Sequence, residues 1–146
     1  DLATRMLEHR IKPEIEVFDL AMLYSAVRLA EKGLLQSPLH VQFVMGVPNA
    51  LPVRREILDF ELAQLKTLLP TATWTVAGVG RGQLDANHWA LELGGHCRTG
   101  LEDNLRFDGS RLASSNAELV ARVAELCVDY GRHPASVTEA RQILGL

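Results

Sequence analysis

Cysteine is scarce in this chain, with two residues among 146, and neither Cys97 nor Cys127 has a partner at CxxC spacing. We therefore expect thiols in a reducing compartment and no disulfide framework. Long hydrophobic runs are also missing, since no apolar stretch reaches the roughly 20 residues that span a bilayer. The start of the sequence does not resemble a signal peptide, so the pattern indicates a cytoplasmic protein without a membrane partner.

Clustered basic charge and histidine motifs are absent as well. The chain has 15 lysines and arginines against 18 acids, a net charge of −3, and its basic residues are scattered singly. This distribution argues against a nucleic-acid partner. The five histidines show no HxH or HxxxH spacing, so they do not form a metal site on their own. No GxSxG motif or Ser-His-Asp pattern is present either.

What the sequence does contain is a regular alternation of strand and helix patterns. Strands are predicted near 14–19, 40–47, 73–79 and 95–100, and helices at 20–35, 54–69, 83–93, 116–131 and 137–144. The two middle strands are almost continuously apolar, which is typical of parallel strands covered on both faces. No linker divides the chain, so we expect a single α/β domain over residues 1–146 built from four βα units.

Four βα units form either a small open sheet or half of an eightfold barrel. A complete TIM barrel needs about 200 residues or more, so this chain cannot be one alone. Half a barrel would leave two bare strand edges and an uncovered inner face, which favour pairing with something else. The chain begins at Asp1 rather than at a methionine, so we expect that an upstream portion is missing.

The segment 94–104 is the most informative part of the sequence. It starts as a short apolar strand and then presents Arg98, Glu102, Asp103 and Asn104. Ligands of α/β proteins bind at the carboxyl ends of strands, and buried acids there are costly unless they bind something. A carboxylate could ligate a divalent cation, and Arg98 could hold a substrate carboxylate. The alternative is a salt-bridged loop without chemistry.

Two further strand ends carry candidate site residues. Glu14 and Glu16 share one face of their strand, and Asp19 at its carboxyl end is either a site residue or the N-cap of the next helix. The turn at 78–83 is rich in glycine and contains Gly80 and Arg81. Backbone amides and an arginine beside a helix start can bind an anion, although a plain tight turn explains the same residues.

Taken in order, these segments resemble the beta-keto acid cleavage enzyme family, whose best-known activity is 3-keto-5-aminohexanoate cleavage in lysine fermentation. The resemblance lies in residues 13–19, 41–48, 74–81, 94–104, 115–120 and 140–146. It covers essentially the whole chain but only the carboxyl-terminal half of the family. It implies the corresponding half of a TIM (β/α)8 barrel, one zinc ion, and conversion of a beta-keto acid and acetyl-CoA into acetoacetate and a new CoA thioester.

The resemblance also implies roles for individual residues. Glu102 would be a zinc ligand, Asp103 would help position groups for proton transfer and CoA-ester chemistry, and Arg98 would assist acid–base catalysis through a water. Glu16 matches an acid near the site, with Glu14 as the alternative. Gly80 and Arg81 are our candidates for binding the CoA co-substrate.

Two departures from the family qualify this reading. The HxH pair that completes the family's zinc site is absent and would come from the missing amino-terminal half. In addition, residues 48–51 replace a glycine-rich loop, which predicts different loop closure or specificity. We therefore expect part of a cytoplasmic zinc enzyme that is a homo-oligomer at full length. The alternatives are a non-catalytic module that binds an anion at 78–83, and a subunit that completes its barrel with a separate partner.

We predict that the isolated chain of 146 residues neither binds zinc tightly nor turns over, because catalytic zinc usually has three protein ligands and one glutamate is not enough. Metal analysis after dialysis and an acetoacetate assay check this. Stoichiometric zinc together with acetoacetate formation would contradict it.

Overall fold

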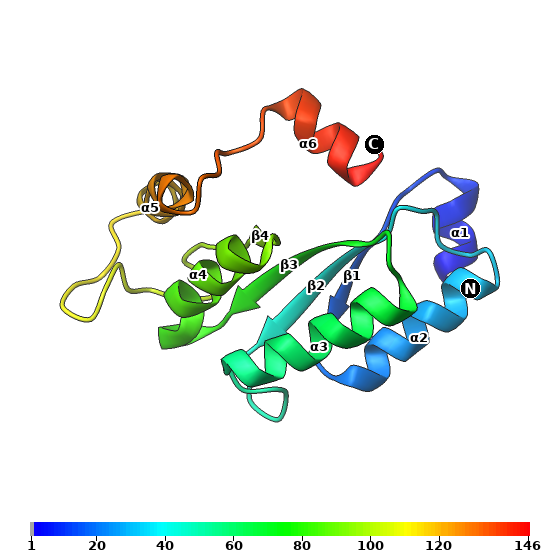
Figure 1. The fold of residues 1–146 in the computed structure, drawn as a ribbon, viewed down its shortest axis with the longest axis horizontal. Helices are drawn as coiled ribbons and strands as arrows, with labels where there is room; N and C mark the ends of the chain where they lie inside the picture. Colours follow the sequence, from blue (N-terminus) through cyan, green and yellow to red (C-terminus); the bar gives the residue numbers. More distant parts are fainter. Residues whose placement is uncertain (1) are drawn as a thin grey trace.

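The computed structural model describes residues 2–146 and contains one sheet of four parallel strands in the order β1-β2-β3-β4 (Figure 1). The strands are β1 (Glu14–Val17), β2 (His40–Met45), β3 (Thr73–Gly78) and β4 (His96–Cys97). The order follows the chain, and helices alternate with the strands. This α/β arrangement is consistent with half of a TIM barrel, so the predicted fold class is confirmed.

The helices between strands cover one side of the sheet. They are α2 (Leu20–Glu31), α3 (Arg55–Leu68), the short 3-10 helix η1 (Gly80–Gly82) and α4 (Gln83–Leu93). The chain also has α1 (Leu2–Glu8) before the sheet and α5 (Asn116–Asp129) and α6 (Val137–Leu144) after it. In Figure 1, α2 and α3 lie side by side below the sheet and α4 packs at β3 and β4, whereas α5 and α6 lie beyond β4 and above the sheet. No helix in residues 2–146 is long and apolar enough to cross a membrane.

The hydrophobic core lies between the sheet and these helices. Val17, Phe43 and Val76 are in register on neighbouring strands and are at most 1% exposed. They belong to one cluster with Leu58 and Leu65 of α3. Burial of such side chains contributes about 1.5 to 3 kcal/mol each, so this face holds the sheet and helices together.

The opposite face of the sheet is polar. Glu16, Gln42, Thr75 and His96 lie in one row across the four strands, because side chains alternate between the two faces. Arg98 follows His96 by two residues and continues this face at the end of β4. In a closed barrel this would be the inner face, which carries the site residues.

The structure corrects several predicted boundaries. β4 ends at Cys97 rather than at residue 100, although the Arg98 amide still donates to Val76 O at 3.2 Å. The following residues leave the sheet because Thr99 and Gly100 are hydrogen-bonded to the Gln83 side chain at the start of α4. Helix α1 was not predicted.

Polar side chains cap the start of three helices. Asp19 is the N-cap of α2, as one of the two sequence interpretations expected, since its carboxylate accepts from the Met22 amide at 3.2 Å. Ser136 and Glu139 form a complete capping box at α6. At α5, Ser115 accepts from the Glu118 amide, but the Glu118 carboxylate binds Ser114 and Arg111 and does not close a box.

Helix α3 carries an acid in the core. Glu61 is 1% exposed, and neither carboxylate oxygen has a hydrogen-bond partner among the described residues. Burial, with a smaller contribution from Asp19, raises the pKa of Glu61 from 4.5 to about 7. The folded protein therefore binds more protons than the unfolded chain between these two pH values, and stability must fall as pH rises through this window.

We predict that Glu61→Gln removes about 2 to 3 kcal/mol of pH-dependent change in the free energy of unfolding between pH 4.5 and 7. Urea denaturation across this range measures it. Glu56→Gln, an exposed site on the same helix, is the control and should keep the wild-type profile. An unchanged profile in Glu61→Gln would show that Glu61 does not cause the pH dependence.

Candidate functional site

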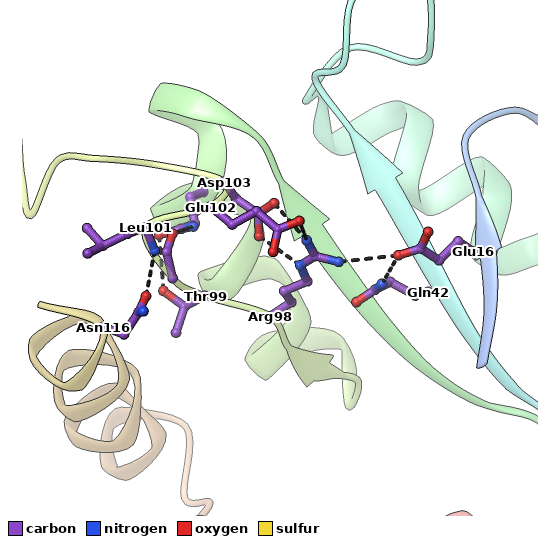
Figure 2. Close-up of polar contacts among 10 residues, drawn as sticks. Glu16, Gln42, Arg98, Thr99, Leu101, Glu102, Asp103 and Asn116 are labelled. Atoms are coloured by element: carbon purple, nitrogen blue, oxygen red, sulfur yellow. Dashed lines mark hydrogen bonds and ion pairs between the residues drawn. The ribbon is translucent and has the colours of Figure 1, made fainter. Parts of the chain in front are cut away.

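Arg98 is the centre of the polar cluster at the carboxyl ends of the strands (Figure 2). Its Nε and Nη2 atoms donate to the two carboxylate oxygens of Asp103 at 2.8 and 2.9 Å. This is the two-pronged geometry in which guanidinium and carboxylate bind most strongly. The Asp103 side chain is only 8% exposed, so the pair is largely shielded from water.

Two glutamates complete the surroundings of the guanidinium. Nη1 of Arg98 lies 3.3 Å from Oε1 of Glu16 on β1, and Nη2 lies 3.2 Å from Oε1 of Glu102. The same Glu16 oxygen accepts from Nε2 of Gln42 at 2.9 Å, which fixes its position on the sheet. The structure thus brings together Arg98, Glu16, Glu102 and Asp103, all of which the sequence singles out.

Electrostatics keep Arg98 charged. The hydrogen bonds that Arg98 donates to Asp103, followed by the charges of Asp103, Glu102 and Glu16, raise the pKa of Arg98 although burial opposes this. Burial and the neighbouring Glu16 raise the pKa of Glu14. Glu14 lies one row below Glu16, with a carboxylate oxygen 3.9 Å from Nε2 of His40. It is Glu16 that contacts Arg98 directly.

The loop that carries the acids is fixed by three contacts from elsewhere in the fold. The Gly80 amide donates to the Asp103 carbonyl at 2.7 Å, and the Leu101 amide donates to Oδ1 of Asn116 at 2.7 Å. The Gln83 side chain forms two further hydrogen bonds: its Nε2 donates to the Gly100 carbonyl, and its Oε1 accepts from the Thr99 hydroxyl. The sequence analysis did not identify Gln83, Asn116 or Gln42 as supports, since each acts on residues that lie far away in the sequence.

Two backbone amides at the glycine turn, which the sequence suggested as an anion site, already have partners within the fold. The Gly80 amide is used by Asp103 and the Val79 amide donates to Met45 O at 2.9 Å. Gly80 has φ +69°, a conformation that glycine adopts without steric cost. Arg81 makes no contact with Arg98 and lines a separate cavity with Arg106 and Arg122.

Glu102 is the residue best placed to meet a metal ion. Its side chain is 86% exposed and, within residues 2–146, forms an ion pair only with Arg98 through Oε1, so the second carboxylate oxygen has no partner there. Within residues 2–146, no group of three or more histidine, cysteine, aspartate or glutamate side chains is arranged to hold a metal ion. Residues 2–146 therefore do not provide the three protein ligands that a catalytic zinc site usually has.

The fold and this site together define an α/β protein of the TIM-barrel type, with its charged residues at the carboxyl ends of the strands. The chain belongs to the beta-keto acid cleavage enzyme family, whose sequence model matches residues 1–146. The resemblance described from the sequence is thereby confirmed.

Relatives in the family carry several specificities. The chain is 57% identical over 145 residues to a 3-oxoadipate:acetyl-CoA acetyltransferase of Cupriavidus necator, covering 99% of this chain and 51% of that protein. It is 44% identical to a 3-keto-5-aminohexanoate cleavage enzyme of Fusobacterium nucleatum, covering 97% and 50%. A 3-dehydrocarnitine:acetyl-CoA trimethylamine transferase of Rhizobium meliloti is 32% identical, with 100% and 47% covered. The chain thus spans about half the length of these relatives.

We predict that Arg98 and Asp103 are energetically coupled. A double-mutant cycle with Arg98→Gln and Asp103→Asn, read by urea denaturation, should give a coupling free energy of about 1 to 2 kcal/mol, because the pair is two-pronged and half-buried. The exposed pair Arg5 and Glu8, 3.6 Å apart, should give about 0.5 kcal/mol or less. Equal coupling in the two cycles would contradict the central place given to Arg98 and Asp103.

Proposed function

We propose that this chain is the carboxyl-terminal half of a zinc-dependent enzyme that cleaves a beta-keto acid with acetyl-CoA. The observation that carries the proposal is the contact of Arg98 with Asp103, Glu16 and Glu102 at the strand ends of a chain that belongs to this family over its whole length. The relatives named for acetyl-CoA support the co-substrate. The activity and the homo-oligomeric state belong to the longer protein.

The reaction exchanges acyl groups. The bond between the keto carbon and the methylene carbon of the beta-keto acid breaks, and the keto carbon becomes the acyl carbon of a new CoA thioester. The acetyl group of acetyl-CoA joins the remaining two-carbon acid, which gives acetoacetate. Carbon–carbon cleavage of this kind develops negative charge on oxygen, so a site must hold cationic and metal groups where that charge forms.

Three of the five N–H donors of Arg98 are hydrogen-bonded to Asp103 and Glu16. Nη2 also forms an ion pair with Glu102, and one donor on Nη1 is left for a water or a substrate oxygen. This supports the role of orienting substrate and assisting proton transfer through a water, rather than gripping a carboxylate with two direct bonds. Asp103 holds the guanidinium in place. Glu16 is the acid on β1 that could accept or return a proton near the same atoms.

Glu102 would bind zinc, with the remaining ligands supplied from outside this chain. When bound, the ion would act as a Lewis acid that polarises the keto group of the substrate. Coordination by Glu102 would weaken its contact with Arg98 and free a second guanidinium donor for the substrate.

A separately encoded partner is a second candidate arrangement. The polar inner face and the free edges of β1 and β4 favour a subunit whose barrel is closed by another chain. The non-catalytic module is a third interpretation, and the activity assay below separates it from the enzyme, because a non-catalytic module forms no acetoacetate.

We predict that the chain becomes active when the amino-terminal half of the Cupriavidus necator relative is supplied, either fused upstream or as a separate chain. The assay follows acetoacetate from 3-oxoadipate and acetyl-CoA, because 3-oxoadipate is the substrate in that relative's name. Activity from the separate chains would favour the subunit arrangement.

Within the fused protein, Glu102→Gln should lower both bound zinc and activity, by about 100-fold or more for activity, since it removes a metal ligand. Glu125→Gln on α5 is the matched control and should retain both. Full activity and full zinc content in Glu102→Gln would rule out the proposed metal role of Glu102.

A further inference from the structure

The cavity lined by Arg81 has a volume of about 310 Å³ and lies between the start of α4, residues 104–109 and α5. Figure 1 shows the segment between β4 and α5 extending past the beginning of α4. Three arginines from three different segments line it: Arg81, Arg106 and Arg122. The volume is at the low end for ligand sites, so it suits one group of a ligand rather than a whole cofactor.

Arg122 is the buried member of the three. It is 9% exposed, its Nη1 donates to the Phe107 carbonyl, and its guanidinium lies 5.1 Å from the centre of the Phe107 ring. Its Nε and Nη2 atoms have no hydrogen-bond partner among the described residues. A buried cation with unpaired donors is costly, and an anion in the cavity would satisfy them.

The other two arginines are exposed and available. Neither Arg81 nor Arg106 has an ion pair or side-chain hydrogen bond with any residue in 2–146. Two acids, Asp85 and Asp108, also line the cavity. Oδ1 of Asp108 already accepts from the Ser110 amide, the Ser110 hydroxyl and the Arg111 amide, so it is directed into its own turn.

We propose that this cavity binds a phosphate group. Phosphate oxygens can accept from several guanidinium groups at once, and arginine is the side chain that matches this geometry best. The cavity joins the Arg98 site through the chain itself, because Asn104 lines it and directly follows Asp103. The ligand in the longer protein is a phosphate of acetyl-CoA, an assignment that rests on the proposed function.

Titration of the chain with inorganic pyrophosphate, followed by calorimetry, tests the site. Saturable binding is expected, with affinity about tenfold lower in Arg122→Gln, because hydrogen bonds to a charged group are lost. Arg122 is buried, so the exposed pair Arg81→Gln and Arg106→Gln provides a second variant with the same expected loss and an intact interior. The control is Arg28→Gln on α2, which removes the same charge at the far end of the sheet. Binding that is absent, or equal in all variants, would overturn the phosphate site.

Competition identifies the source of the phosphate. CoA should displace pyrophosphate, whereas pantetheine, which has no phosphate, should not. Pyrophosphate binding that CoA does not displace would overturn the acetyl-CoA assignment. If the fused protein forms acetoacetate while pyrophosphate does not bind, this inference fails and the proposed function stands.

Discussion

The two-pronged ion pair between Arg98 and Asp103 is the interaction on which the candidate site depends. It joins the end of β4 to the loop that follows, and the Asp103 carbonyl joins that loop to the Gly80 turn after β3. The Leu101 amide donates to the Asn116 side chain, which connects the same loop to the start of α5. A half-buried guanidinium needs this carboxylate to offset its loss of hydration, so geometry and charge are set together.

Because side chains alternate along parallel strands, one face of the sheet is apolar and packs against the helices, and the other face is polar and lies beside Arg98. Val17, Phe43 and Val76 pack under the helices, whereas Glu16 and Gln42 point to the other side beside Arg98. In an isolated sheet, a polar face of this kind does not enclose a site. In a protein about twice as long, as the relatives are, the same residues would line the inside of a barrel.

The parts of this picture that depend on local sequence could be predicted. The apolar runs of β2 and β3 indicated parallel strands, and Arg98, Glu102 and Asp103 stand close enough in sequence to suggest one site. The supports could not be found in this way, because Gln83 and Asn116 reach the loop from distant segments. β4 is shorter than predicted for the same reason, since the hydrogen bond between Thr99 and the distant Gln83 draws the chain out of the sheet.

The cluster of three arginines around the cavity could not be predicted from the sequence either, because tertiary folding brings its members together. Arg81 was singled out for its place in a glycine turn, but its neighbours Arg106 and Arg122 lie 25 and 41 residues further along the chain. Its expected partner Gly80 donates instead to the Asp103 carbonyl.

The most direct test of the account is isotope tracing in the fused protein with acetyl-CoA labelled in the acetyl carbons and unlabelled 3-oxoadipate. The account predicts label in the ketone half of acetoacetate and an unlabelled new acyl-CoA. Label that remains in acetyl-CoA, with no labelled acetoacetate, would contradict it.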